Sequence, residues 1–191
     1  TTLMNILAGL YKPDGGQIFL KGREVEFHSP KDAIEHGIGM VHQHFMLVES
    51  LTVTENIILS LQRSGMNLHA NQVKQRILEL SSQYHLLVDP DASIWQLSVG
   101  EQQRVEIMRL LYRGAETLIL DEPTAVLTPE EATDLAKILR KMADEGKAVI
   151  LITHKLNEVT AFSDRVTVLR AGHVVSNLLT KETTKKELAR L

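Results

Sequence analysis

Three short apolar runs have the pattern of β-strands that are buried on both faces. They cover residues 38–41, 117–120 and 148–152, and aliphatic side chains dominate them. Strands of this kind belong to parallel sheets that helices cover on both sides. Two further segments, 17–27 and 165–177, alternate in polarity around a glycine-containing turn and are typical of hairpins. The strand pattern therefore predicts an α/β fold.

Apolar residues at three- and four-residue spacing predict helices over most of the remaining chain. Two helix starts carry capping boxes, in which a threonine is followed three residues later by a glutamate: Thr52 with Glu55, and Thr128 with Glu131. No strand is expected within residues 46–113, which are therefore predicted to form a helical lobe. Helices are expected at residues 1–10, 30–36, 52–61, 71–86, 99–112, 128–145 and 180–191.

Composition limits the classes of function. The 191 residues are enough for one domain with a full core, and 43% hydrophobic residues is ordinary for a globular protein. A net charge of -3 provides no broad attraction to nucleic acid or to an anionic membrane. The chain has no cysteine, which excludes disulfides and thiolate metal sites. We expect neither a transmembrane span nor a signal peptide, because no apolar run is long enough and the start lacks a basic region.

Two acidic residues, Asp121 and Glu122, directly follow the apolar run at 117–120. Open α/β sheets bind their ligands at the carboxyl ends of the strands. We therefore expect Asp121 to hold a hydrated Mg²⁺ and Glu122 to face the water that attacks a phosphate. The simpler alternative is a strand followed by a polar turn.

A second candidate site is the helix start at Ser98, Val99, Gly100, Glu101 and Gln102. Free backbone N–H groups, a serine hydroxyl and a glycine without a side chain make such a start suitable for an anion. A serine in this place can equally be only the N-cap of the helix. The predicted helix continues with Arg104, Arg109 and Arg113, which we expect to form a solvated basic face.

The two motifs together resemble the signature sequence and the Walker B segment of the ATP-binding-cassette (ABC) family. Residues 97–103 match the signature, and residues 118–123 match the Walker B segment. The resemblance covers essentially the whole chain and implies a P-loop NTPase fold, with a RecA-like, mostly parallel sheet flanked by helices and an inserted α-helical subdomain. It implies that residues 1–45 and 114–191 form the ATPase core and that residues 46–113 form the helical signature subdomain.

Other positions match further motifs of the family. Gln43 follows a predicted strand and resembles the Q-loop glutamine, which joins the two lobes. His154 follows another strand and resembles the H-loop histidine, which contacts the γ-phosphate and orients the attacking water. By the same resemblance, Thr1 would ligate Mg²⁺ and Thr2 would bond the α-phosphate. Alone, each would be interpreted as a surface residue or a helix cap. The implied Mg²⁺ ligands are Thr1, Gln43 and Asp121, and the implied catalytic residues are Glu122 and His154.

In the ABC family, ATP lies between two cassettes, and the signature of one contacts the nucleotide held by the other. The resemblance therefore implies that residues 98–102 bind nucleotide and that the partner is a second cassette, in the same chain or in a homodimer. Residues 41–48, 98–104 and 124–129 most resemble the amino-terminal ATPase half of simple-sugar or nucleoside importers. This implies an ATP-hydrolysing subunit at the cytoplasmic face of the plasma membrane. Its partners would be transmembrane permease subunits and, indirectly, a solute-binding protein, but no nucleic acid.

The resemblance has two departures and leaves alternatives open. Thr128 stands where the family usually has an aspartate, and a glycine-rich phosphate loop ending in Gly-Lys would precede Thr1. We therefore expect a polypeptide that starts at Thr1 to show no ATPase activity above background. The alternatives are a soluble ABC ATPase acting on ribosomes or DNA, and an inactive fragment. Trp95 is expected to pack beneath the signature, and a metal site at His42 and His44 is not expected.

Overall fold

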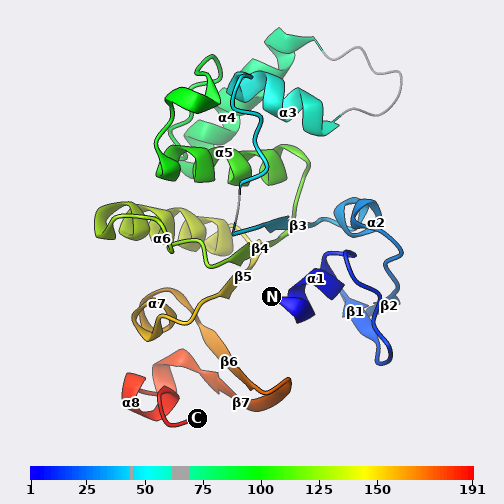
Figure 1. Ribbon diagram of the computed structural model, residues 1–191, viewed down its shortest axis with the longest axis vertical. Helices are drawn as coiled ribbons and strands as arrows, with labels where there is room; N and C mark the ends of the chain where they lie inside the picture. Colours follow the sequence, from blue (N-terminus) through cyan, green and yellow to red (C-terminus); the bar gives the residue numbers. More distant parts are fainter. Residues whose placement is uncertain (44, 62–68) are drawn as a thin grey trace. The chain divides into compact units, whose positions relative to one another are not determined.

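The computed structural model describes residues 1–43, 45–61 and 69–191 (Figure 1). The chain divides into two compact units, Thr1–Ile152 and Thr153–Leu191. The predicted lobe at 46–113 contains, in its described part, the helices α3 (Val53–Leu61), α4 (Ala70–Tyr84) and α5 (Val99–Tyr112), the short 3-10 helix η1 (Ile94–Gln96) and one isolated bridge between Thr52 and Ser93. Its status as a separate subdomain remains a prediction. His44 lies outside the described residues.

The first unit is built on a parallel three-stranded sheet with the strand order β3-β4-β5. Val41 at the end of β3 pairs with Leu120 of β4. Asp121 at the end of β4 pairs with Ile152 at the end of β5. The three carboxyl ends therefore meet at one edge of the sheet, as the apolar runs predicted. The strands are β3 (Ile38–Val41), β4 (Thr117–Asp121) and β5 (Ala148–Ile152).

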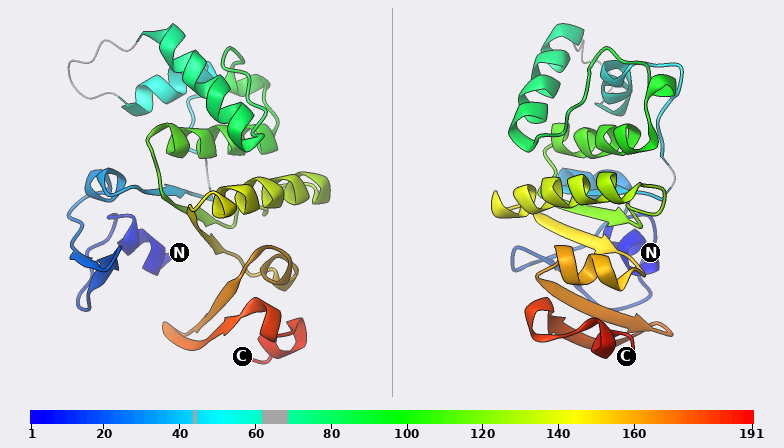
Figure 2. Two further views of the ribbon diagram at one scale, coloured as in Figure 1. Left: turned by 180° about the vertical axis from the view of Figure 1, so that it is seen from behind. Right: turned by 90° about the vertical axis from the view of Figure 1, so that its left-hand side faces the viewer.

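Alternate residues of the central strand β4 contribute to two cores on opposite faces of the sheet. Leu118 and Leu120 belong to the core that α3, α4, α5 and α6 (Pro129–Asp144) complete. Ile119 belongs to the other core, which is covered by α1 (Thr2–Leu7) and α2 (Pro30–Glu35). All three side chains are fully buried. Figure 2 shows α5 and α6 on one side of the strands and α1 on the other. A strand with apolar cover on both faces needs the uninterrupted apolar run seen in the sequence.

The predicted helix starts are confirmed by their capping contacts. The backbone N–H of Thr52 donates to Glu55 at 2.7 Å, and the N–H of Glu55 donates to the Thr52 hydroxyl at 3.2 Å. The bonds from the Thr52 backbone and hydroxyl favour the charged carboxylate and lower the pKa of Glu55. Thr128 and Glu131 form the same pair of bonds, at 3.0 and 3.2 Å, at the start of α6.

The end of α1 is set by Gly9, whose φ of +72° is a left-handed conformation that few other residues adopt. This turn ends the helix earlier than the predicted residue 10. Gly9 also abuts the N-cap residue of α2, Ser29, since a Cβ atom on Gly9 would lie 2.3 Å from the Ser29 carbonyl oxygen. Because a glycine is required on both grounds, α1 is fixed against the start of α2.

Two sequence-based expectations for the helical part are wrong. Trp95 is 66% exposed, because in η1 its neighbour Ile94 takes the buried position. The basic face of α5 is also not fully solvated: Arg109 donates to the carbonyl of Met46, and Arg113 donates to the carbonyl of Ser60 near the end of α3. Burial lowers the pKa of Arg113, and the nearby charge of Arg109 adds to this effect.

Two hairpins complete the fold. The first pairs β1 (Ile18–Leu20) with β2 (Arg23–Val25) in the first unit, as predicted. In the second unit β6 (Arg165–Arg170) pairs with β7 (His173–Leu179), and this hairpin was also predicted. This unit further contains the unpredicted helix α7 (Leu156–Phe162), the 3-10 helix η2 (Thr180–Glu182) and the four-residue helix α8 (Lys185–Leu188). Within the described residues, every helix is too short or too polar to cross a lipid bilayer.

Candidate nucleotide-binding site

The structure joins the beginning of the chain to the acidic end of the central strand. The Thr1 hydroxyl donates a hydrogen bond of 2.8 Å to Oδ2 of Asp121, although 120 positions separate the two residues. Thr1 directly precedes α1, and Asp121 is the last residue of β4 with 6% of its surface exposed. The predicted proximity of these two residues is therefore observed.

The Thr1 hydroxyl and the Asp121 carboxylate are suited to a magnesium ion. Both are hard oxygen donors, the type that Mg²⁺ prefers, and Mg²⁺ typically binds one or two carboxylates together with substrate phosphates. Their hydrogen bond holds one oxygen from each residue at the same point of the sheet edge. The donor set of this edge therefore fits Mg²⁺.

Glu122 has an unusual backbone conformation immediately after the strand. Its φ is +48°, a left-handed conformation that costs a non-glycine residue about 1–2 kcal/mol. Two hydrogen bonds fix it: its N–H donates to Ile152 at 2.9 Å, and its carbonyl accepts from Ala125 at 3.1 Å. Backbone strain that the surroundings enforce is concentrated at functional sites. The conformation of Glu122 therefore favours a functional role for its carboxylate.

The other predicted core residues are placed only in part. Gln43 is exposed and lies two residues beyond β3, whose carboxyl end shares its edge with that of β4. Thr2 is exposed at the first position of α1. His154 belongs to the second compact unit, so its predicted place near the other site residues stays a prediction. The structure thus brings Thr1 and Asp121 into contact and leaves the roles of the others to be tested.

The predicted anion site at the start of α5 is a well-formed helix N-terminus. Ser98 is the N-cap residue: its hydroxyl accepts from the N–H of Glu101 at 3.3 Å, and its own N–H donates to the Glu101 carboxylate at 2.8 Å. The Gln102 amide donates to the carbonyl of Leu97 at 3.1 Å. Glu101 and Gln102 therefore shape the helix start with their side chains. Val99 is 42% exposed in the first turn.

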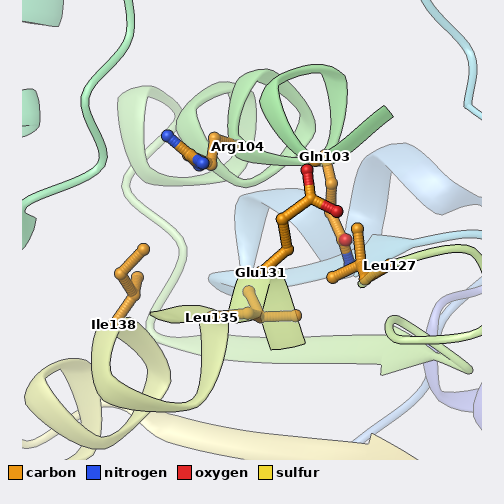
Figure 3. A pocket seen from close by; sticks show the side chains of 7 residues that line it. Gln103, Arg104, Leu127, Glu131, Leu135 and Ile138 are labelled. Carbon is orange, nitrogen blue, oxygen red and sulfur yellow. The ribbon is translucent and has the colours of Figure 1, made fainter. Parts of the chain in front are cut away.

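Gly100 is buried against a residue that the sequence indicated only as a helix cap. A Cβ atom on Gly100 would lie 2.5 Å from Oε1 of Glu131, whose other oxygen accepts from the backbone of Thr128. Figure 3 shows Glu131 extending from α6 towards α5 inside a small pocket. The buried Gln103 lies in the same pocket, and its Oε1 has no hydrogen-bond partner among the described residues. The pocket is lined by Gly100, Gln103, Arg104, Leu127, Glu131, Leu135 and Ile138.

Gly100 and Glu131 should show a coupled effect on stability. In the wild-type background, Gly100→Ala gains about 0.5–1 kcal/mol of helix propensity but forces Glu131 out of its capping box, which offsets the gain. With Glu131→Ala already present, the collision is absent and Gly100→Ala should stabilise the chain. Urea unfolding of both single variants and the double variant should give a coupling energy of about 1 kcal/mol. Additive effects, within about 0.3 kcal/mol, would show that the close contact has no energetic consequence.

The sequence model of the family described as "ABC transporter" matches residues 1–125. The chain belongs to this family. Among its relatives, the "Nucleoside import ATP-binding protein NupA" of Lactococcus lactis subsp. cremoris (strain MG1363) is 54% identical over 192 residues, which cover 100% of this chain and 38% of that protein. The "Glucose import ATP-binding protein TsgD13" of Haloferax volcanii is 45% identical over 220 residues, covering 100% of this chain and 40% of that protein. The chain thus spans 38–40% of the length of these two relatives.

A solved structure confirms the predicted fold class. The ATP-binding cassette MJ0796, in a dimeric post-hydrolysis state bound to ADP and Pi, superposes with a TM-score of 0.76 and 26% sequence identity. The match covers 94% of this chain and 79% of that one. The α/β fold with a parallel sheet, predicted from the apolar runs and from the ABC resemblance, is therefore correct.

Proposed function

We propose that this chain is part of the ATP-binding and ATP-hydrolysing subunit of an ABC importer for a nucleoside or a sugar. The observation that carries the proposal is the hydrogen bond of Thr1 to Asp121, because it puts the start of the first helix beside the acidic end of β4. The names of the two relatives, one a nucleoside and one a glucose import protein, support the importer class.

The predicted site residues have distinct proposed roles in hydrolysis. Thr1, Gln43 and Asp121 would hold Mg²⁺, which supplies charge neutralisation for the β- and γ-phosphates when bound. Thr2 bonds the α-phosphate. Glu122 accepts the proton of the attacking water as a general base. His154 donates a hydrogen bond to the γ-phosphate.

The start of α5 serves a second nucleotide. Ser98, Val99 and Gly100 contact the γ-phosphate of ATP bound to another cassette, through the hydroxyl and the free N–H groups of the first turn. Glu101 and Gln102 keep that turn in shape through the bonds they make to Ser98 and Leu97. The second cassette lies in the same polypeptide or in a homodimer, and the dimeric state of the similar cassette supports this arrangement.

The remaining partners follow from transport. The subunit acts at the cytoplasmic face of the membrane and passes its movement to permease subunits, which receive solute from a solute-binding protein. Phe45, Met46, Leu47 and Val48 are the proposed contacts with the permease. Met46 and Val48 are 70% and 40% exposed.

Uptake by the full-length subunit tests the proposal. The subunit, reconstituted with its permease and solute-binding protein in liposomes loaded with Mg-ATP, should accumulate radiolabelled nucleosides or sugars. Liposomes loaded with ADP are the control and should accumulate neither. ATP hydrolysis that responds to ribosomes or DNA, without uptake of any solute, would refute import and favour the soluble class of ABC ATPase.

A further inference from the structure

Two side chains of α5 hold both polar groups of a single backbone residue outside the helix. The N–H of Met46 donates to Oε1 of Glu106 at 2.8 Å, and its carbonyl accepts from Nη1 of Arg109 at 2.8 Å. Glu106 and Arg109 also bond to each other at 3.1 Å. The three residues therefore form a closed ring of polar contacts, in which Met46 is joined to residues 60 and 63 positions away. We call Glu106 and Arg109 the Met46 clamp.

Asn56 of α3 binds both backbone polar groups of Val48, the second residue after Met46. Its Oδ1 accepts from the N–H of Val48 at 2.8 Å, and its Nδ2 donates to the carbonyl of Val48 at 3.1 Å. The segment 45–48 is thus held at two alternate residues, Met46 and Val48, by polar side chains of two helices. We call Asn56 the Val48 clamp.

Leu47 packs against the hydrophobic core, but at Met46 and Val48 backbone contacts position the chain where side-chain packing does not. The Met46 side chain is 70% exposed and that of Val48 is 40% exposed, so neither residue is fixed by its own burial. The groups that hold them are more enclosed: Asn56 is 3% exposed and the Glu106 side chain 8% exposed, both buried, and the Arg109 side chain is partly buried at 19% exposed. Bonds to buried charged groups are screened little by solvent and are stronger than neutral ones.

The same helix carries the candidate phosphate contacts and the Met46 clamp. Ser98 and Glu106 are eight positions apart on α5, which corresponds to about 12 Å of continuous helix. A helix of this length moves as a unit, because its turns are joined by i to i−4 hydrogen bonds. Any displacement of the start of α5 by a bound phosphate therefore displaces the Met46 clamp as well.

We propose that Glu106 and Arg109, together with Asn56, are positioning residues that tie the segment 45–48 to the helical part of the chain. They transmit movement of α5 to the exposed side chains of Met46 and Val48. This inference rests on the proposed function for its consequence in transport. The other part of the inference, that these side chains attach the segment to the helices, does not depend on a bound nucleotide.

Hydrogen exchange of the full-length subunit tests the attachment directly. Glu106→Ala should speed exchange of the Met46 amide at least about tenfold, since a bond to a charged acceptor is lost. Glu106→Gln keeps an oxygen that can accept the Met46 N–H, and should restore most of the protection. Asn56→Asp keeps the acceptor for the Val48 N–H but loses the donor to its carbonyl, so the Val48 amide should stay protected. Unchanged exchange at Met46 in Glu106→Ala would overturn the proposal.

A matched control is available on α4. Glu79 pairs with Arg76 at 3.0 Å with the same three-residue spacing, but both side chains are about half exposed. Glu79→Ala removes a glutamate–arginine pair of the same kind from an exposed helix face. It should leave the exchange of Met46 and Val48 unchanged. An equal effect of Glu79→Ala and Glu106→Ala on Met46 would indicate general destabilisation and would overturn the specific clamp.

Transport separates positioning from simple stability. In Glu106→Ala, ATP hydrolysis by the subunit alone should stay within about twofold of wild type, whereas stimulation by the permease and solute should be largely lost. Glu106→Gln should retain most of the stimulation. Normal stimulation in Glu106→Ala, despite faster exchange at Met46, would overturn the transmission of movement. A wild-type subunit that neither binds nor hydrolyses ATP would instead refute the proposed function, and the exchange results would stand apart from it.

Discussion

Replacing Glu122 with glutamine in the full-length subunit should lower kcat for ATP hydrolysis about 10²–10⁴-fold and leave the Kd for Mg-ATP nearly unchanged. Glutamine has the shape of glutamate but its amide cannot accept the proton of the attacking water. The left-handed turn at this position is held by backbone bonds to Ile152 and Ala125, which the substitution keeps. Phosphate release measures turnover, and equilibrium binding of a fluorescent ATP analogue measures affinity.

Glu116→Gln is the matched control for this substitution. Glu116 directly precedes β4, at the end of the strand opposite Asp121, and is bonded to Lys21. The same change of charge at the wrong end of the strand should leave both kcat and Kd within about twofold of wild type. Equal losses in the two variants would point to destabilisation of β4, and undiminished turnover in Glu122→Gln would remove Glu122 from catalysis.

Asp121→Asn should abolish the Mg²⁺ dependence of ATP binding and lower Mg-ATP turnover about 10²–10³-fold. Asparagine keeps an oxygen that can accept the Thr1 hydroxyl, so the start of α1 should stay beside β4. Thermal unfolding should be unchanged or shifted upwards, because the substitution removes a buried carboxylate. The measurement is a titration of ATP affinity and turnover with Mg²⁺.

The control for Asp121→Asn is Asp134→Asn on the exposed face of α6, where the carboxylate bonds to Lys137. It should preserve the wild-type response to Mg²⁺. A full response to Mg²⁺ in Asp121→Asn would exclude this residue from the metal site. A large drop in unfolding temperature would instead show that the Thr1 bond needs the charge of Asp121.

The sequence predicted the sheet and the long helices from local signals: apolar runs for the strands, and apolar residues at helical spacing for the helices, with a capping signal in some of them. The central strand is covered on both faces and needs a continuous apolar run, and α6 has a cap, a first-turn proline and a capping glutamate in succession. The unpredicted helix α7 lacks such a start signal. Its N-cap residue is Lys155, which makes no capping bond with its side chain. Local patterns therefore predicted the strands and helices that have a clear apolar pattern or a capping signal.

Local patterns did not predict contacts between segments that are far apart in the sequence. The proximity of Thr1 and Asp121 was predicted only through the ABC resemblance, because no pattern within the chain relates residues 120 positions apart. The Met46 clamp was missed. Glu106 and Arg109 look like ordinary helix residues until a backbone segment is placed against them. Trp95 was expected to pack beneath the signature, but in η1 its neighbour Ile94 takes the buried position.

The close approach of Gly9 to Ser29 has a consequence for natural variation. A side chain at position 9 collides with main-chain atoms, which cannot rotate aside as a flexible side chain can. To relieve this collision α1 would have to move away from Ser29, and the hydroxyl of Thr1 would then lose its hydrogen bond to the carboxylate of Asp121. A genetic screen for lost uptake should therefore recover replacements at Gly9 as readily as at Asp121 and Glu122, although glycine has no functional group of its own.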